Sequence, residues 1–286
     1  MKLALSNAAL PPGARAAWLP RLADLGIEGI ELSSAASWGD AWRAPSAALV
    51  AETGNWLRTA ELEAVGLHVP LDQHAGMGWF GTAGQREETL AWLVRLSAAC
   101  RDLGGRTLVL GGGRWRGRLP VRRAWRLTLD FLHAVLARIE AHGTLLCLAP
   151  LARDEGDFCL TATECRILAD VLEHSSFGLK FNAAAMCDSG EMGKHAVFSA
   201  HYGRLELFTA DEPQGLPFAT SGQVDHAAFR RHLAASGYRD WVCMAQQAGD
   251  RSLAAAIARF VACYRRIDNL SLVQRQERRR MAAGIR

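Results

Sequence analysis

The stretch RLELFTADEPQGLPFATSGQVDHAAFRRHLAASGYRDWVCMAQ, residues 204–246, reads as a strand, a loop, a helix and a second strand in that order. Its two ends are short apolar runs, which indicate buried strands. Between them, residues 225–236 carry apolar side chains at helical spacing, and Gly237 follows where a helix C-terminal glycine belongs. A buried strand followed by a helix and by another buried strand is the repeating unit of a parallel α/β fold.

The same unit recurs along the chain. Predicted strands, with helical segments between them, cover residues 2–6, 26–32, 66–71, 106–112, 144–151, 177–182, 204–210 and 241–246. Eight such units in 286 residues match the size of a single α/β barrel, which typically has about 250 residues. We therefore predict an α/β fold, a single (β/α)8 TIM barrel over residues 1–267, whose functional end lies at the carboxyl ends of the strands.

Composition and charge narrow the classes of function. The net charge is only +4, and the sequence has no apolar run of membrane-spanning length and no signal-peptide pattern. We therefore expect a cytoplasmic protein with no nucleic-acid partner and no membrane partner. The seven cysteines never form a C-x-x-C pair, which argues against a disulfide framework or a zinc knot. The Arg-rich extension, residues 268–286, is a solvated helix, a disordered tail or a contact for a homo-oligomer or protein partner.

A charged residue interrupts the predicted strand FGLKFN at residues 177–182. Successive strand side chains alternate between two faces, so Lys180 and Asn182 share a face, and in a closed barrel that face is the inside. Lysine is rare here, since Lys2 and Lys194 are the only others. A buried ammonium is tolerated when it is paired. We expect Lys180 either to form a structural ion pair or to act as a catalyst, by Schiff-base formation or general-base action.

Three segments carry a resemblance to a known family. LAPLAR (148–153) is similar to a Glu-Pro-Leu-Asn-Arg motif, and FGLKFNAAA (177–185) is similar to a strand that ends in Asp with His three residues later. TADEP (209–213) and residues 222–245 are similar to an Asp-x-Pro loop and to the helix and final strand that follow it. On these motifs the sequence resembles the sugar phosphate isomerase/epimerase superfamily, the xylose isomerase-like TIM barrels with hydroxypyruvate isomerase and the ketose 3-epimerases as relatives.

The resemblance implies a divalent metal held by two glutamates, an aspartate and a histidine or glutamine. At those positions, and at that of the histidine after the aspartate, this sequence has Ala149, Asn182, Phe208, Ala245 and Ala185. Alanine and phenylalanine have no donor atoms, and one neutral amide does not retain a hard cation. We therefore predict that the family metal site is lost. We expect no metal and no cofactor, since the G-x-S-x-G, P-loop and H-E-x-x-H motifs are also missing from the sequence.

The same alignment suggests a partner for the buried lysine. If Asn182 and Phe208 point inward at the ends of neighbouring strands, Lys180 and Glu206 point inward one layer below them. We predict a Lys180–Glu206 ion pair that fills the barrel and replaces the positive charge of the metal. In the catalytic alternative, the same two residues belong to the active site.

Further candidate site residues follow the predicted strands. The loop LDQHAGMGWFG (71–81) supplies Asp72 and His74 as acid/base catalysts, and its glycines together with Trp79 suit a lid over a ligand. Glu31 either binds substrate hydroxyl groups or caps a turn. His68 is either a satisfied core histidine or a base.

Three more residues are candidates for ligand binding. Arg153 either takes an anionic group with its planar fork or forms a surface salt bridge. Asp211 matches a family aspartate, although capping the turn before Pro213 explains it equally well. The glycine run before Arg114, in GGGR at 111–114, either lets the backbone approach a ligand such as a phosphate or forms a flexible turn.

These expectations define a predicted function. We expect a divergent sugar isomerase/epimerase-like protein that acts on, or binds, a small polar carbonyl or sugar-like ligand without a divalent metal. If it is an enzyme, it is a metal-independent isomerase, epimerase or lyase that shifts a proton next to a carbonyl with acid/base residues at the barrel mouth. The alternative is a non-catalytic barrel, a pseudoenzyme that serves as a binding or scaffold subunit.

Overall fold

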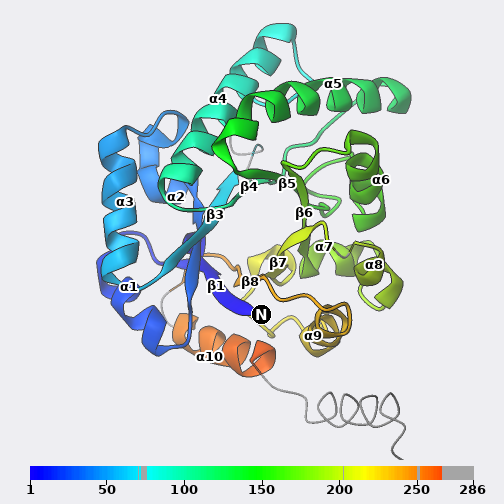
Figure 1. Cartoon of the computed structure of the whole chain (residues 1–286). Coiled ribbons are helices and arrows are strands. Elements are labelled where there is room, and N and C mark those ends of the chain that lie inside the picture. The colour runs from blue at the N-terminus through cyan, green and yellow to red at the C-terminus, as the bar shows by residue number, and fades with distance from the viewer. Residues whose placement is uncertain (70, 72–75, 202, 250–251, 266–286) are drawn as a thin grey trace, which may run out of the picture.

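The computed structural model describes residues 1–69, 71, 76–201, 203–249 and 252–265. Parallel strands pair in sequence order, and the last pairs with the first, which closes a barrel (Figure 1). The strands are β1 (Lys2–Ser6), β2 (Gly29–Ser33), β3 (Glu63–Val69), β4 (Thr107–Leu110), β5 (Leu145–Leu148), β6 (Phe177–Asn182), β7 (Leu205–Ala210) and β8 (Trp241–Met244). The predicted single TIM barrel is confirmed.

Helices form a ring outside the strands (Figure 1). In the described part of the chain they are α1 (Arg15–Asp24), α2 (Ser34–Trp38), α3 (Ala47–Thr59), α4 (Ala83–Asp102), α5 (Val121–Ile139), α6 (Ala162–Leu172), α7 (Ala183–Asp188), α8 (His195–Ala200), α9 (His226–Ala235) and α10 (Leu253–Tyr264). The sequence did not predict α2 and α7, which start immediately after β2 and β6. These helices have only 5 and 6 residues, too few for a helical hydrophobic period to show.

Side-chain caps fix where two long helices begin. At the start of α4, Thr82 and Gln85 exchange hydrogen bonds: the amide of Gln85 donates to the Thr82 hydroxyl at 3.3 Å, and the amide of Thr82 donates to the Gln85 side chain at 2.8 Å. Thr161 and Glu164 form the same capping box at the start of α6. Each box satisfies amide groups that lack a partner within the helix. Both helices therefore start at defined points at the carboxyl ends of the strands.

The hydrophobic core has two layers. The larger lies between the strands and the helices and contains side chains such as Phe181, Phe208 and Trp92. The smaller lies inside the barrel and consists of Ala4, Val65, Val109, Leu145, Cys147, Leu207 and Cys243. Most of these inner side chains are small or of medium size, and polar residues share the interior with them. The inside of the barrel can therefore hold charged groups as well as apolar ones.

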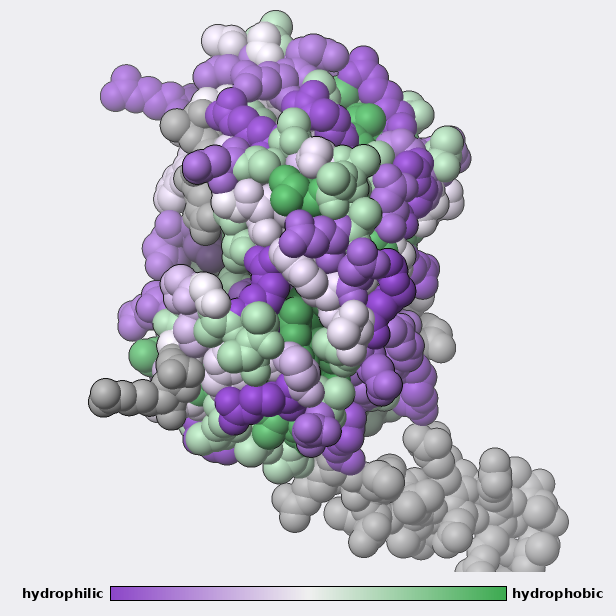
Figure 2. Space-filling view, turned by 90° about the vertical axis from the view of Figure 1, so that its left-hand side faces the viewer, coloured by the Kyte–Doolittle hydropathy of each residue, from purple (hydrophilic) through white to green (hydrophobic). Residues whose placement is uncertain are grey.

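The outer surface is mixed in polarity. The face that carries α1 and α3 shows hydrophobic residues scattered among hydrophilic ones (Figure 2). Within the described segments, no helix has the length and apolar character that crossing a membrane requires. The predicted boundary at residue 267 and the extension 268–286 lie outside the described residues.

Candidate functional site

The inner face of β6 carries the two polar residues that stand out in the sequence. Phe181 packs outward against Phe198 of α8 and His201, with ring centroids 5.8 and 4.8 Å apart. Because neighbouring strand residues point to opposite faces, Lys180 and Asn182 point into the barrel. Lys180 lies in the middle of the strand, and Asn182 lies at its carboxyl end.

Lys180 forms a buried ion pair with Glu31. Its Nζ lies 3.1 Å from Glu31 Oε1 and 3.5 Å from Oε2, and the two side chains are 6% and 1% exposed. Glu31 is on β2, which lies four strands from β6 in either direction around the closed barrel. The pair therefore spans the interior between opposite walls. Cys243 of β8 adds a weak hydrogen bond, with its Sγ 3.6 Å from Glu31 Oε2.

Both members of this pair are charged at neutral pH. Burial acts to raise the pKa of Glu31, but the Lys180 ammonium and then His68 lower it, and the net pKa lies below its ordinary value. Burial acts to lower the pKa of Lys180, but the Glu31 carboxylate raises it, and the net pKa lies above its ordinary value. Lys180 is therefore an ammonium ion, the form that can neither form a Schiff base nor accept a proton.

The predicted Lys180–Glu206 pair is wrong. Glu206 instead lies 3.2 Å from Arg106, which precedes β4 and so lies at the opposite end of the barrel from the mouth. The physical reason is a bulge, because Leu179 pairs with Leu205 whereas Lys180 pairs with Leu207, which leaves Glu206 without a partner in the register. A one-residue shift changes the face to which each later side chain points.

The bulge also corrects the predicted position of Phe208. Its ring points outward and packs against Phe229 of α9 and Tyr264 of α10, with centroids 5.2 and 6.3 Å away. Thr209 points inward instead and pairs in register with Asn182 on β6. Sequence reasoning missed Thr209 because the family alignment assigned the mouth position of this strand to Phe208, and the bulge was not foreseen.

Asn182 and Thr209 place two oxygen atoms on paired strands at the mouth. Asn182 Oδ1 and Thr209 Oγ1 are both buried, and neither has a hydrogen-bond partner among the described residues. Buried polar atoms are rarely left in this state, because each one without a partner costs about 1–3 kcal/mol. Two such atoms on paired strands can receive hydrogen bonds from the hydroxyl groups of a ligand.

Asp211 follows β7 at the same end of the barrel. Burial raises its pKa to about 7, although the hydrogen bond from the Ala184 amide and the charge of Lys180 act to lower it. The Ala184 amide, at the start of α7, donates to Asp211 Oδ1 at 2.9 Å. Asp211 thus caps a helix rather than the turn before Pro213. A carboxyl group with a pKa near 7 can both take and give a proton at neutral pH.

His68 faces the buried pair from β3. Burial, followed by the charge of Lys180, lowers its pKa to about 4, and only Glu31 opposes this effect. Its imidazole is therefore neutral at physiological pH. In this form it can accept or donate a hydrogen bond, but it adds no charge to the site.

The remaining predicted site residues lie elsewhere or cannot be placed. Trp79 is buried against α5, where its Nε1 donates to Thr128 at 2.8 Å and its ring stacks on Phe131. Arg153 is largely exposed and lies 3.8 Å from Asp188, in the surface salt bridge that was one of its two predicted roles. Asp72 and His74 lie outside the described residues.

Arg114 is fully enclosed below the loop that follows β5. Its guanidinium donates to the carbonyl oxygen of Phe158 at 3.1 Å, to that of Cys159 at 2.9 Å and to that of Ala149. Nη1 has no hydrogen-bond partner in the described part of the chain. Arg114 therefore ties the loop after β4 to the carboxyl end of β5.

Among the described residues, the side chains at the mouth do not include the donor set of the metal that the resemblance implies. Ala149 and Ala245 follow β5 and β8 and have no donor atoms, and the inward residue of β7 is a threonine. Over the described ranges, no three His, Cys, Asp or Glu side chains are arranged so that they could hold a metal ion. Hard cations require several oxygen ligands in one place.

The geometry defines a parallel α/β barrel with a polar, partly charged interior below its mouth. A sequence model of the family described as xylose isomerase-like TIM barrel matches residues 19–263, and the chain belongs to this family. A search of the curated proteins found no match.

Solved structures with similar folds are sugar epimerases and related proteins. D-psicose 3-epimerase from Clostridium cellulolyticum H10, crystallised with D-tagatose, has a TM-score of 0.75 at 15% identity, over 90% of this chain and 89% of that one. The 3-keto-D-glucoside 4-epimerase from E. coli has a TM-score of 0.75 at 18% identity, over 93% and 99%. The IOLI protein with a bound zinc atom has a TM-score of 0.70 at 14% identity, over 92% and 98%. These likenesses show the fold.

Proposed function

We propose that the protein acts on a sugar-like hydroxy-ketone at the carboxyl ends of its strands, and moves a proton on the carbon next to the carbonyl without a divalent metal. The observation that carries this proposal is the position of two unpartnered buried oxygens, Asn182 Oδ1 and Thr209 Oγ1, at the mouth that also holds Asp211. The two oxygens can accept hydrogen bonds from ligand hydroxyl groups, and the pKa of Asp211 near 7 suits proton transfer at neutral pH.

Each polar group has a distinct role in this proposal. Asn182 and Thr209 orient the ligand by accepting hydrogen bonds from its hydroxyl groups. Asp211, as a carboxylate, takes the proton from the carbon next to the carbonyl and, as a carboxylic acid, returns it. The Lys180 ammonium, which already affects the pKa of Asp211 and His68, stabilises the negative charge that develops on the ligand oxygen.

The pairing of Lys180 with Glu31 favours the predicted structural role over the predicted catalytic one. A Schiff-base or general-base lysine has to be neutral, whereas the Glu31 carboxylate keeps this amine protonated. We therefore assign Lys180 an electrostatic and structural role. The neutral His68 completes the wall of the site from β3.

Deuterium exchange tests the proposal without knowledge of the physiological substrate. The protein is treated with EDTA, desalted and incubated in D2O with D-fructose, D-tagatose, D-psicose and L-ribulose, and NMR follows the hydrogen next to the carbonyl. We expect deuterium incorporation with at least one ketose. Asp211→Asn removes the acid/base group and keeps the acceptor for Ala184, so we expect it to abolish incorporation.

A matched control separates chemistry from folding. Asp170→Asn makes the same change on the exposed surface of α6, in the group of Arg166 and Arg204, and should leave exchange unchanged. Exchange that appears only after addition of manganese, cobalt or magnesium would refute metal independence. Saturable ketose binding without exchange in any condition would favour the non-catalytic barrel, and neither binding nor exchange would refute both.

A further inference from the structure

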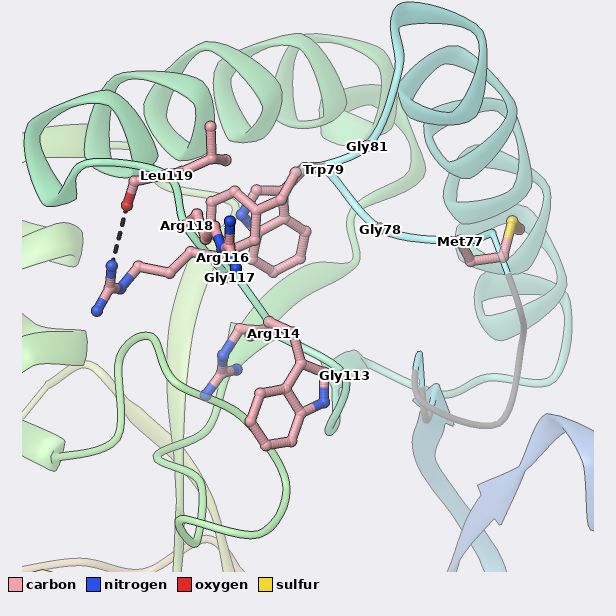
Figure 3. A pocket seen from close by; sticks show the side chains of 12 residues that line it. Met77, Gly78, Trp79, Gly81, Gly113, Arg114, Arg116, Gly117, Arg118 and Leu119 are labelled. Carbon is pink, nitrogen blue, oxygen red and sulfur yellow. Dashed lines mark hydrogen bonds between the residues drawn. The ribbon is translucent and has the colours of Figure 1, made fainter.

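A cavity opens at the mouth end of the barrel, away from β6 and β7. Its walls are the loop between β3 and α4, at residues 77–81, and the loop between β4 and α5, at residues 113–119, and it has a volume of about 530 Å3 (Figure 3). Both loops follow the carboxyl ends of their strands, so this cavity belongs to the same end of the barrel as Asn182 and Asp211.

The described residues that line the cavity include three arginines and no acidic side chain. The arginines are Arg114, Arg116 and Arg118. Within the described segments none of these arginines lies within 4.0 Å of an acidic side chain. Arginines in proteins usually find carboxylate or phosphate partners, because the guanidinium fork matches both. Arg116 and Arg118, beside one cavity, favour a ligand with an oxyanion group.

The loop that presents these arginines is held in place. Asp157 Oδ1 accepts a hydrogen bond from the amide of Arg116 at 2.6 Å, and Asp157 Oδ2 accepts one from the amide of Gly117 at 3.2 Å. The guanidinium of Arg116 donates to the carbonyl of Leu119 at 2.9 Å, which ties this side chain to its own loop (Figure 3). Asp157 thus binds backbone amides, and no described ion pair joins it to the arginine side chains.

An exposed tryptophan lies next to the arginines. Trp115 lines the cavity and is 52% exposed, which is unusual for so large an apolar side chain. An aromatic ring at the edge of a cavity can pack against the apolar face of a sugar. The cavity thus offers both a stacking surface and cationic groups.

We propose that this cavity is a second ligand subsite that binds the oxyanion group of the molecule whose carbonyl end occupies the mouth. This inference rests on the proposed function, because it adds a phosphate or carboxylate group to the sugar-like ligand proposed there. Arg116 and Arg118 contact the oxyanion, and Arg114 is a positioning residue, since its guanidinium is turned toward the carbonyl groups of Phe158, Cys159 and Ala149. The GGGR segment then serves a ligand rather than acting only as a turn.

Calorimetric titration with paired ligands tests the inference. The probes are D-fructose, D-fructose 6-phosphate and 5-keto-D-gluconate, and the second and third distinguish a phosphate from a carboxylate. We expect at least one anionic sugar to bind tenfold or more tightly than D-fructose. The double variant R116Q/R118Q should remove this advantage and leave D-fructose binding unchanged.

The control variant is R122Q/R123Q, which removes two exposed arginines from the first turn of α5 without changing the cavity lining. It should change every affinity less than twofold. Equal losses in both double variants would show a general effect of net charge and overturn the inference. No advantage for either anionic sugar would overturn it too, while deuterium exchange on a neutral ketose would leave the proposed function standing.

Discussion

The buried pair of Lys180 and Glu31 allows a quantitative prediction of stability. Lys180→Met removes the ammonium and keeps an unbranched side chain, so Glu31, at 1% exposure, becomes a buried carboxylate without its partner. Loss of one member of a buried pair typically costs about 3–5 kcal/mol. In a chain of this length about 2 °C of melting temperature corresponds to each kcal/mol, so we expect a decrease of about 6–10 °C.

Two further variants isolate the cause. K180M/E31Q removes both charges, and we expect it to recover most of the lost stability because no unpaired charge remains. Lys2→Met breaks a lysine–glutamate pair of similar length, 2.9 Å to Glu63, but one that is 48% and 60% exposed. That change should cost at most about 1 kcal/mol.

The pH dependence of the free energy of unfolding gives an independent check that Lys180 stabilises the charged form of Glu31. In the wild type, the lowered pKa of Glu31 means that the pair contributes stability above the unfolded pKa of about 4.3 and loses it as the pH falls. In K180M, burial raises the pKa of Glu31 above its unfolded value, so the variant loses stability as the pH rises. The difference between the two proteins should therefore be larger at pH 8 than at pH 5.

Circular dichroism during urea and thermal denaturation at both pH values measures these differences. A cost for K180M below about 1 kcal/mol at pH 8, in the range of exposed pairs, would refute the buried pairing. The same conclusion would follow if K180M/E31Q were as unstable as K180M.

Three further predictions concern single side chains at and around the mouth. Because the pKa of Asp211 is raised to about 7, its contribution to stability is lost as the pH rises through that value. Asp211→Asn should therefore gain stability relative to the wild type between pH 5 and pH 8 in denaturation experiments. A stability difference that stays constant over this range would contradict the prediction. His68, with a pKa of about 4, should give the NMR signals of a neutral imidazole at pH 5.5, and a titration near pH 6.5 would show that it is exposed to solvent. Arg153→Ala should change ketose affinity less than twofold in calorimetry, because its pair with Asp188 is exposed; a tenfold loss would return it to the site.

The sequence predicted the barrel because strand and helix periodicities are local properties. Each strand is a short apolar run, and the glycines that follow the helices mark where the next strand begins. That Lys180 and Asn182 share a face could also be predicted, because alternation along a strand needs no knowledge of its neighbours, and the predicted barrel makes that face the inside.

The tertiary structure decided which residue pairs with Lys180 and which residues lie at the mouth. Glu31 is 149 positions away in the chain, and only closure of the barrel brings the inner faces of β2 and β6 together. The bulge opposite Lys180 moved Glu206 out of the register and replaced Phe208 by Thr209 at the mouth. A bulge depends on how two strands pair, so one strand read alone does not reveal it.

The pKa values of residues at the mouth also depended on the folded structure, because burial shifts them. Nothing in the sequence around Asp211 or His68 indicates an unusual pKa. In the folded chain, burial raises the pKa of Asp211 to about 7 and lowers the pKa of His68 to about 4. The sequence by itself thus determined the barrel and the inward face of β6, which follow from contacts between near neighbours. Only the folded chain decided the ion pair, the unpartnered oxygens and the proton affinities, because these arise from groups that meet across the barrel.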